Sequence, residues 1–136
     1  MTAKIKTIQI IHLAICAGMI LAYIFAGTFT IEQLKGQQID SADLVYLAIP
    51  IATFLLGNFM FKTQLKQLDS KLTLEEQFPI YQTASLIRWS ILEGGAFLIL
   101  FMKPELIIFG LVLILYLVFL RPTEDKIRTD FKSNFQ

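Results

Sequence analysis

The stretch "SLIRWSILEGGAFLILF", residues 85–101, is apolar enough for a transmembrane helix and yet contains Arg88 and Glu93. A bilayer core of about 30 Å needs roughly 17 to 25 helical residues to cross it. Ionisable side chains at that depth are expensive and usually face a protein interior or a water-filled cavity. The stretch therefore predicts a membrane helix whose carboxylate has a specific role.

The composition places the whole chain in the membrane class. Of its 136 residues 55% are hydrophobic, above the roughly 45 to 50% of soluble domains. Mean hydropathy is +0.62. The net charge of +1 and the lack of a dense basic block give no indication of a nucleic-acid partner. The single Cys16 excludes an internal disulfide and a paired-cysteine redox or zinc site. We expect a lipid bilayer around the chain and no cofactor.

Four apolar segments predict an all-α fold, an integral membrane bundle of four transmembrane helices in one domain. Lys103 and Pro104 between the last two segments predict a tight turn and an antiparallel hairpin, because proline suits the first turn of a helix. The predicted helices cover residues 8–29, 44–61, 83–102 and 105–120, and a polar C-terminal tail covers 121–136.

The basic residues predict the orientation of this multi-pass protein. Ten of the 12 Lys and Arg residues fall at one side of the predicted bundle, and only Lys35 and Lys103 fall at the other. Cytoplasmic flanks carry such an excess. Both termini are therefore expected in the cytoplasm, with the helices in a bacterial inner membrane.

The segment after the second helix contains Thr73-Leu-Glu-Glu76, a capping-box pattern that predicts the start of a short helix. Leu65, Leu68 and Leu72 recur at helical spacing, so the second helix could continue as an amphipathic extension. A solvated linker is the alternative.

An internal repeat connects the first and third helices. Residues 10–25, "IIHLAICAGMILAYIF", align without a gap on residues 86–101, "LIRWSILEGGAFLILF". Gly18 then matches Gly94, His12 matches Arg88, and Ala17 takes the place of Glu93. Because both helices are expected to run outward, the halves would be two duplicated parallel hairpins.

Glu93 is the candidate proton- or cation-binding residue, because an acid near the middle of a membrane helix is usually functional. The alternative is a carboxyl that only hydrogen-bonds a neighbouring helix or subunit. At a rise of about 1.5 Å per residue, several polar side chains are expected either at the same depth in the membrane as Glu93 or together at one level closer to the cytoplasmic side. This predicted supporting polar layer consists of His12, Asn58, Arg88, Tyr116 and Thr53. For Arg88 alone, snorkelling to the headgroups is the alternative, and for His12 a hydrogen-bonded interior position.

Small residues four apart on the first helix predict close helix packing. Two small residues of the third helix repeat the start of this stripe, which predicts a contact between the first and third helices. The packing residues are Ala14, Gly18, Ala22, Ala26, Ser90 and Gly94.

A duplicated hairpin with one mid-membrane Glu93 is similar in outline to the proteolipid (c-type) rotor subunits of proton- and sodium-translocating ATPases. In that family the carboxylate lies on the second helix of a hairpin, whereas Glu93 lies on a first helix. "IRWSILEGGAF" and "LRPTED" also resemble segments of small bacterial four-helix membrane proteins, which implies the fold but no activity.

The sequence therefore predicts a polytopic protein that is not an enzyme, since it lacks a recognisable nucleophile, base or metal cluster. Glu93 would bind a proton or small cation in a transport or assembly component. In the alternative, Glu93 only joins helices or subunits, in a homo-oligomer or a larger membrane complex.

Overall fold

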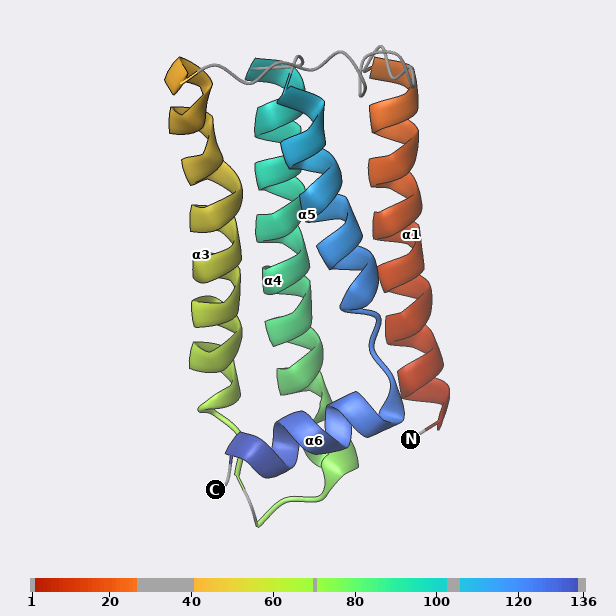
Figure 1. Ribbon diagram of the computed structural model, residues 1–136. Helices are drawn as coiled ribbons and strands as arrows, with labels where there is room; N and C mark the ends of the chain where they lie inside the picture. Colours follow the sequence, from red (N-terminus) through yellow and green to blue (C-terminus); the bar gives the residue numbers. More distant parts are fainter. Residues whose placement is uncertain (1, 27–40, 70, 103–105, 135–136) are drawn as a thin grey trace.

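The computed structural model describes residues 2–26, 41–69, 71–102 and 106–134, and these residues form helices and connections without a β-strand. The all-α prediction is confirmed. The helices are α1 (Thr2–Ala26), the 3-10 helix η1 (Ser41–Leu47), α3 (Ala48–Leu65), α4 (Leu74–Met102), α5 (Ile107–Phe119) and α6 (Glu124–Asn134). Helices α1, α3, α4 and α5 stand together, and α6 lies across one end of them (Figure 1).

Three stretches are long and apolar enough to cross a bilayer. They comprise 23, 25 and 29 residues and cover Ala3–Phe25, Ser41–Leu65 and Leu74–Met102. Helix α5 has only 13 residues, and it passes the same test only together with α6, to which it is bent by 88°. The described residues thus contain three candidate spans, or four if this bent pair is one span. Such helices are compatible with a membrane protein.

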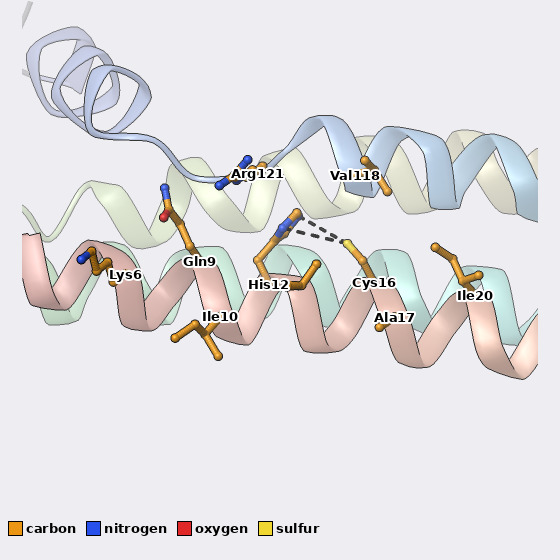
Figure 2. A pocket seen from close by; sticks show the side chains of 10 residues that line it. Lys6, Gln9, Ile10, His12, Cys16, Ala17, Ile20, Val118 and Arg121 are labelled. Atoms are coloured by element: carbon orange, nitrogen blue, oxygen red, sulfur yellow. Dashed lines mark hydrogen bonds between the residues drawn. The ribbon is translucent and has the colours of Figure 1, made fainter.

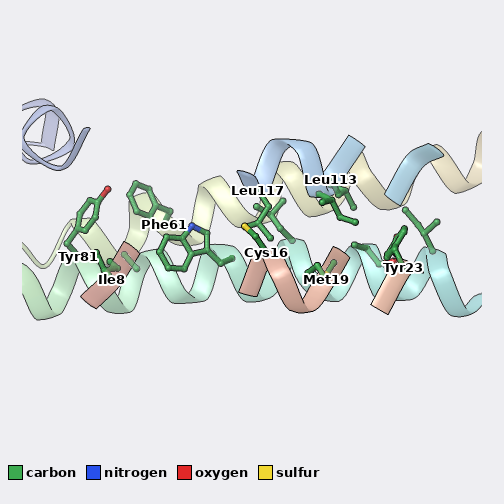
Figure 3. Packing of buried hydrophobic residues seen from close by; sticks show 14 of the residues in the cluster. Ile8, Cys16, Met19, Tyr23, Phe61, Tyr81, Leu113 and Leu117 are labelled. Atoms are coloured by element: carbon green, nitrogen blue, oxygen red, sulfur yellow. The ribbon is translucent and has the colours of Figure 1, made fainter. Parts of the chain in front are cut away.

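Helix α4 occupies the centre of the bundle and packs against α3, α5 and α1. Its Trp89 is completely buried, and α1 contributes Met19 and Tyr23 to the same core (Figure 3). Helices α1 and α4 run in the same direction, as the duplication predicts (Figure 1). However, α1 and α3 lie on opposite sides of α4, so they do not form the first packed hairpin that the duplication requires.

The segment predicted as a polar tail contains helix α6, which corrects that part of the prediction. Thr123 caps the helix, because its Oγ1 accepts a hydrogen bond from the Lys126 N–H at 3.2 Å. Ile127 and Phe131, four residues apart, are 0% and 5% exposed and face the bundle. Two apolar side chains one turn apart are therefore enough to fix this otherwise polar helix against the core.

The predicted capping box is confirmed at the start of α4. The Thr73 N–H donates to Glu76 Oε2 at 3.0 Å, and the Glu76 N–H donates to Thr73 Oγ1 at 3.2 Å. It begins α4 itself rather than a separate short helix. Helix α3 continues one turn beyond its predicted end, to Leu65, because Leu65 is buried against the bundle.

Helices α1 and α4 pack against each other as predicted, but not through the predicted small residues. A Cβ added at Gly18 or at Gly94 would meet no atom within 4 Å. Ala14 and Ser90 are exposed and Ala22 is half-buried, whereas the side chain of Ala26 lies outside the described residues. The sequence spacing correctly places these small residues on one face of each helix, but those faces are not the ones buried in the bundle.

The close helix contacts use other glycines. A Cβ at Gly95 would lie 2.5 Å from Thr53 Oγ1 and 2.8 Å from its Cγ2, so α3 and α4 approach closely there. A Cβ at Gly110 of α5 would collide with the Tyr23 hydroxyl, which donates a 2.6 Å hydrogen bond to the Ala96 carbonyl. Gly95 thus allows α3 and α4 to approach closely, and Gly110 leaves room on α5 for the Tyr23 side chain of α1.

Gly95→Ala is expected to lower the thermal stability of the protein in detergent. Both branches of the stiff Thr53 side chain lie near the added methyl group, so rotation cannot relieve the overlap. Overpacking of this kind costs about 1 to 3 kcal/mol. Gly94→Ala, one residue away and in open space, is the matched control and should be neutral or slightly stabilising. Equal melting curves for the two variants would contradict the α3–α4 contact.

Candidate functional site

Glu93 lies in the second half of α4, nine residues before its end at Met102, and is half-buried. It forms no hydrogen bond or ion pair with another described residue. The structure therefore brings none of the predicted supporting residues to its carboxylate. Whether Glu93 binds a proton or cation stays a prediction from its position.

The predicted polar layer divides into separate pairs. Asn58 Nδ2 of α3 donates to the Tyr116 hydroxyl of α5 at 3.2 Å, which joins these two helices. Thr53 is buried against Gly95 and acts in packing. Arg88 lines a cavity together with Asn58, whereas His12 interacts elsewhere.

His12 lies on α1 at the side of a cavity of about 730 Å³ between α1 and the end of α5 (Figure 2). Its Nε2 is 2.7 Å from the Leu117 carbonyl oxygen. Since a carbonyl can only accept, Nε2 carries the proton in this contact. Cys16 Sγ lies 3.6 Å from the same nitrogen, and the imidazole centroid lies 4.8 Å from the Trp89 ring. His12 is thus a hydrogen-bonded interior histidine that fixes α1 to α5.

Arg88 does not extend freely toward the end of the bundle. Its guanidinium carbon lies 3.7 Å from the centroid of the Phe61 ring, a cation–π contact between α4 and α3. Gly57 of α3 lies directly beside it, because a Cβ there would be in ordinary van der Waals contact, 3.5 Å from Arg88 Cγ. The Arg88 Nε is buried and has no hydrogen-bond partner among the described residues. The chain therefore holds a cation in place and leaves one of its donors unused.

Helix α6 brings a carboxylate to the same region. The Tyr81 hydroxyl donates a 2.9 Å hydrogen bond to Asp130 Oδ2, and the Tyr81 ring stacks on Phe131 with centroids 5.8 Å apart. Asp130 and Arg88 both line two cavities, one of about 420 Å³ beside α3 and one of about 350 Å³ beneath α5. Lys62 and Lys66 line the first, and Lys126 lines the second. Basic and acidic side chains from α3, α4 and α6 thus line neighbouring cavities at this end of the bundle.

Burial raises the pKa of the Asp130 carboxyl above its usual range. The hydrogen bond from Tyr81 and the positive charges of Arg88 and Lys126 act in the opposite direction, and burial has the larger effect. The ionised form of Asp130 is therefore less favourable in the folded protein than in the unfolded chain.

The sequence interpretation missed Asp130 because it lies in the segment expected to be a tail. A signal was present: Thr123 followed by Glu124 and Asp125 is a helix start, and it places Ile127, Asp130 and Phe131 on one face. No three or more His, Cys, Asp or Glu side chains in the described ranges are grouped so that they could hold a metal ion.

Comparisons with protein-family models, with curated proteins and with solved structures found no match to this chain.

Asp130→Asn is expected to change the pH dependence of stability. Because the folded pKa of Asp130 is raised, the folded state binds the proton more tightly, and the free energy of unfolding of the wild type decreases as pH rises through that pKa. Asn keeps an acceptor for the Tyr81 hydroxyl but cannot ionise. The variant should therefore lack this decrease and should melt at or above the wild-type temperature near neutral pH.

The measurement is thermal unfolding in detergent between about pH 4 and pH 8. Asp125→Asn, an exposed acid on the same helix, is the control and should leave the pH profile unchanged. A wild type whose stability increases with pH relative to Asp130→Asn would contradict the burial of this carboxyl.

Proposed function

We propose that the protein is a non-enzymatic, multi-pass inner-membrane protein with four transmembrane helices and both termini in the cytoplasm. In this proposal Glu93 binds a proton or a small cation, and the protein acts as a component of a transport system or a membrane assembly. Three candidate spans and the bent α5–α6 pair support the bundle. Large apolar side chains on the outer surface, such as Phe25, Phe59 and Phe101, support its place in lipid.

One observation carries the role of Glu93. A half-buried carboxylate within a candidate span, nine residues before the end of that span, has no hydrogen-bonding or charged partner in the described chain. An isolated carboxylate in a bilayer is unfavourable, so the group must hold a proton, bind a cation or contact another molecule. In the first two cases, Glu93 is a proton or cation site.

The third outcome is the alternative function, a structural or interaction protein in which Glu93 joins subunits. The open surface beside it favours this alternative. Ser90 and Gly94 are both exposed, and a Cβ at Gly94 would meet nothing within 4 Å. A second copy or another membrane protein can approach such a surface closely.

Cysteine labelling tests the topology. With Cys16 replaced by Ala, single cysteines at Gln37 and at the exposed Thr129 should react with a membrane-impermeant maleimide from opposite sides. The excess of Lys and Arg predicts that Thr129 faces the cytoplasm. Reaction of both positions from the same side would contradict the proposed four spans.

Chemical modification and two substitutions test Glu93. A proton site should react selectively with a hydrophobic carbodiimide, which attacks protonated carboxyls within the membrane. Glu93→Gln keeps the shape and a hydrogen-bond donor but cannot ionise, so it should abolish modification and any ion-dependent behaviour. It should leave folding and oligomeric state nearly unchanged.

Glu93→Leu distinguishes the alternative. If Glu93 only joins subunits, Leu should weaken the assembly by about 0.6 to 2 kcal/mol, whereas Gln should have little effect. An active, assembled Gln variant together with a dissociated Leu variant would reject the proton or cation site and favour the structural role.

A further inference from the structure

The cavity beside α3 combines basic and apolar walls. We call it the α3 recess and define it by Asn58, Phe61, Lys62, Lys66, Arg88 and Asp130. It has a volume of about 420 Å³. Three cations and one carboxylate line it, which gives a formal charge of +2. A polar cavity with an excess of positive charge attracts an anion.

Arg88 supplies the donor that such an anion would use. Arg88 lines the recess, and its guanidinium forms no hydrogen bond or salt bridge with another described residue. Asp130, the acid in the recess, already accepts a hydrogen bond from Tyr81. Contact with the Phe61 ring fixes the guanidinium in position. A fixed guanidinium with unused donors is well suited to phosphate, which it can bind through two parallel hydrogen bonds.

The surroundings of the recess favour a lipid as the source of the phosphate. Leu55 and Phe59 are 60% and 65% exposed and precede Lys62 and Lys66 by two helical turns. The same face of α3 therefore changes from apolar to basic at the recess. An acyl chain along the apolar part would leave its headgroup beside the lysines, as in basic pockets between membrane helices that bind anionic headgroups.

We propose that the α3 recess binds the phosphate group of an anionic phospholipid, with Arg88 as the central donor and Lys62 and Lys66 at the rim. Asp130 opposes this binding through its like charge and thereby limits the affinity. The site stands on the geometry of the recess. The choice of a lipid as the ligand rests on the membrane location proposed above, and the proposed topology would place that lipid in the cytoplasmic leaflet.

Native mass spectrometry of the full chain in detergent tests this site. The delipidated protein is titrated with phosphatidylglycerol, and phosphatidylcholine serves as the zwitterionic comparison. We expect one phosphatidylglycerol molecule to bind tightly. Arg88→Gln should weaken this binding about tenfold to a hundredfold, since it removes charge-assisted hydrogen bonds. Asp130→Asn should strengthen it, a gain that a purely structural role of Asp130 does not predict.

Two further variants keep the proposal testable if Arg88→Gln does not fold. The double variant Lys62→Gln, Lys66→Gln changes only exposed side chains and should weaken binding about thirtyfold. Lys71→Gln, an exposed lysine outside the recess, is the control and should bind like the wild type. Thermal unfolding without lipid confirms that each variant is folded.

Three results would overturn the proposal. In the first, folded Arg88 and lysine variants retain wild-type binding. In the second, phosphatidylcholine binds as tightly as phosphatidylglycerol. In the third, inorganic phosphate displaces the lipid and binds with equal affinity, which would make the recess a site for a soluble anion. None of these results depends on Glu93, so they leave the proposed proton or cation role untouched.

Discussion

The contact between α3 and α4 determines where the polar groups of this protein lie. Gly95 lets the backbone of α4 approach Thr53, and two turns earlier Arg88 packs beside Gly57 of α3. Within this interface the Arg88 guanidinium lies over the face of the Phe61 ring. The interface between α3 and α4 thus holds the charge of Arg88.

The same close packing separates polar groups that share a depth in the bundle. His12 bonds to the carbonyl of Leu117 on one side, and Asn58 bonds to Tyr116 on the other. Each pair joins α5 to a different neighbour, α1 or α3. The central α4 carries the fully buried Trp89 and Leu92, so its core face is largely apolar. Polar interactions here hold pairs of helices together rather than forming one connected network.

Helix type and the start of α4 could be read from the sequence, because long apolar runs and a capping box are local patterns. Thr73 and Glu76 need only each other to cap the helix. The packing faces could not be predicted in the same way. Gly94 and Gly95 are adjacent and chemically identical, yet only Gly95 meets another helix. That difference depends on the rotation of α4 about its own axis, which is set by its packing against three neighbouring helices.

The candidate site was predictable in part. Arg88 and Asn58 were expected near one level, and both line the α3 recess. Asp130 was not predicted, because a mostly charged segment with few apolar residues is also typical of a solvated tail. Helix α6 is stabilised because Ile127 and Phe131 are buried against the core of the bundle. The helix propensity of the segment alone does not indicate this tertiary contact.

The shortness of α5 has a consequence for the membrane itself. Thirteen residues extend about 20 Å, well below the hydrocarbon thickness of about 30 Å. The carbonyls that end this helix would then lie at a depth where water is scarce. Lys126 Nζ donates to the Phe119 and Arg121 carbonyls at 2.8 and 3.1 Å, and so replaces the missing water. In the proposed membrane bundle, with α6 turned by 88° beneath α5, the side formed by α5 would be thinner than the others, and lipids there would have to shorten or tilt to match it.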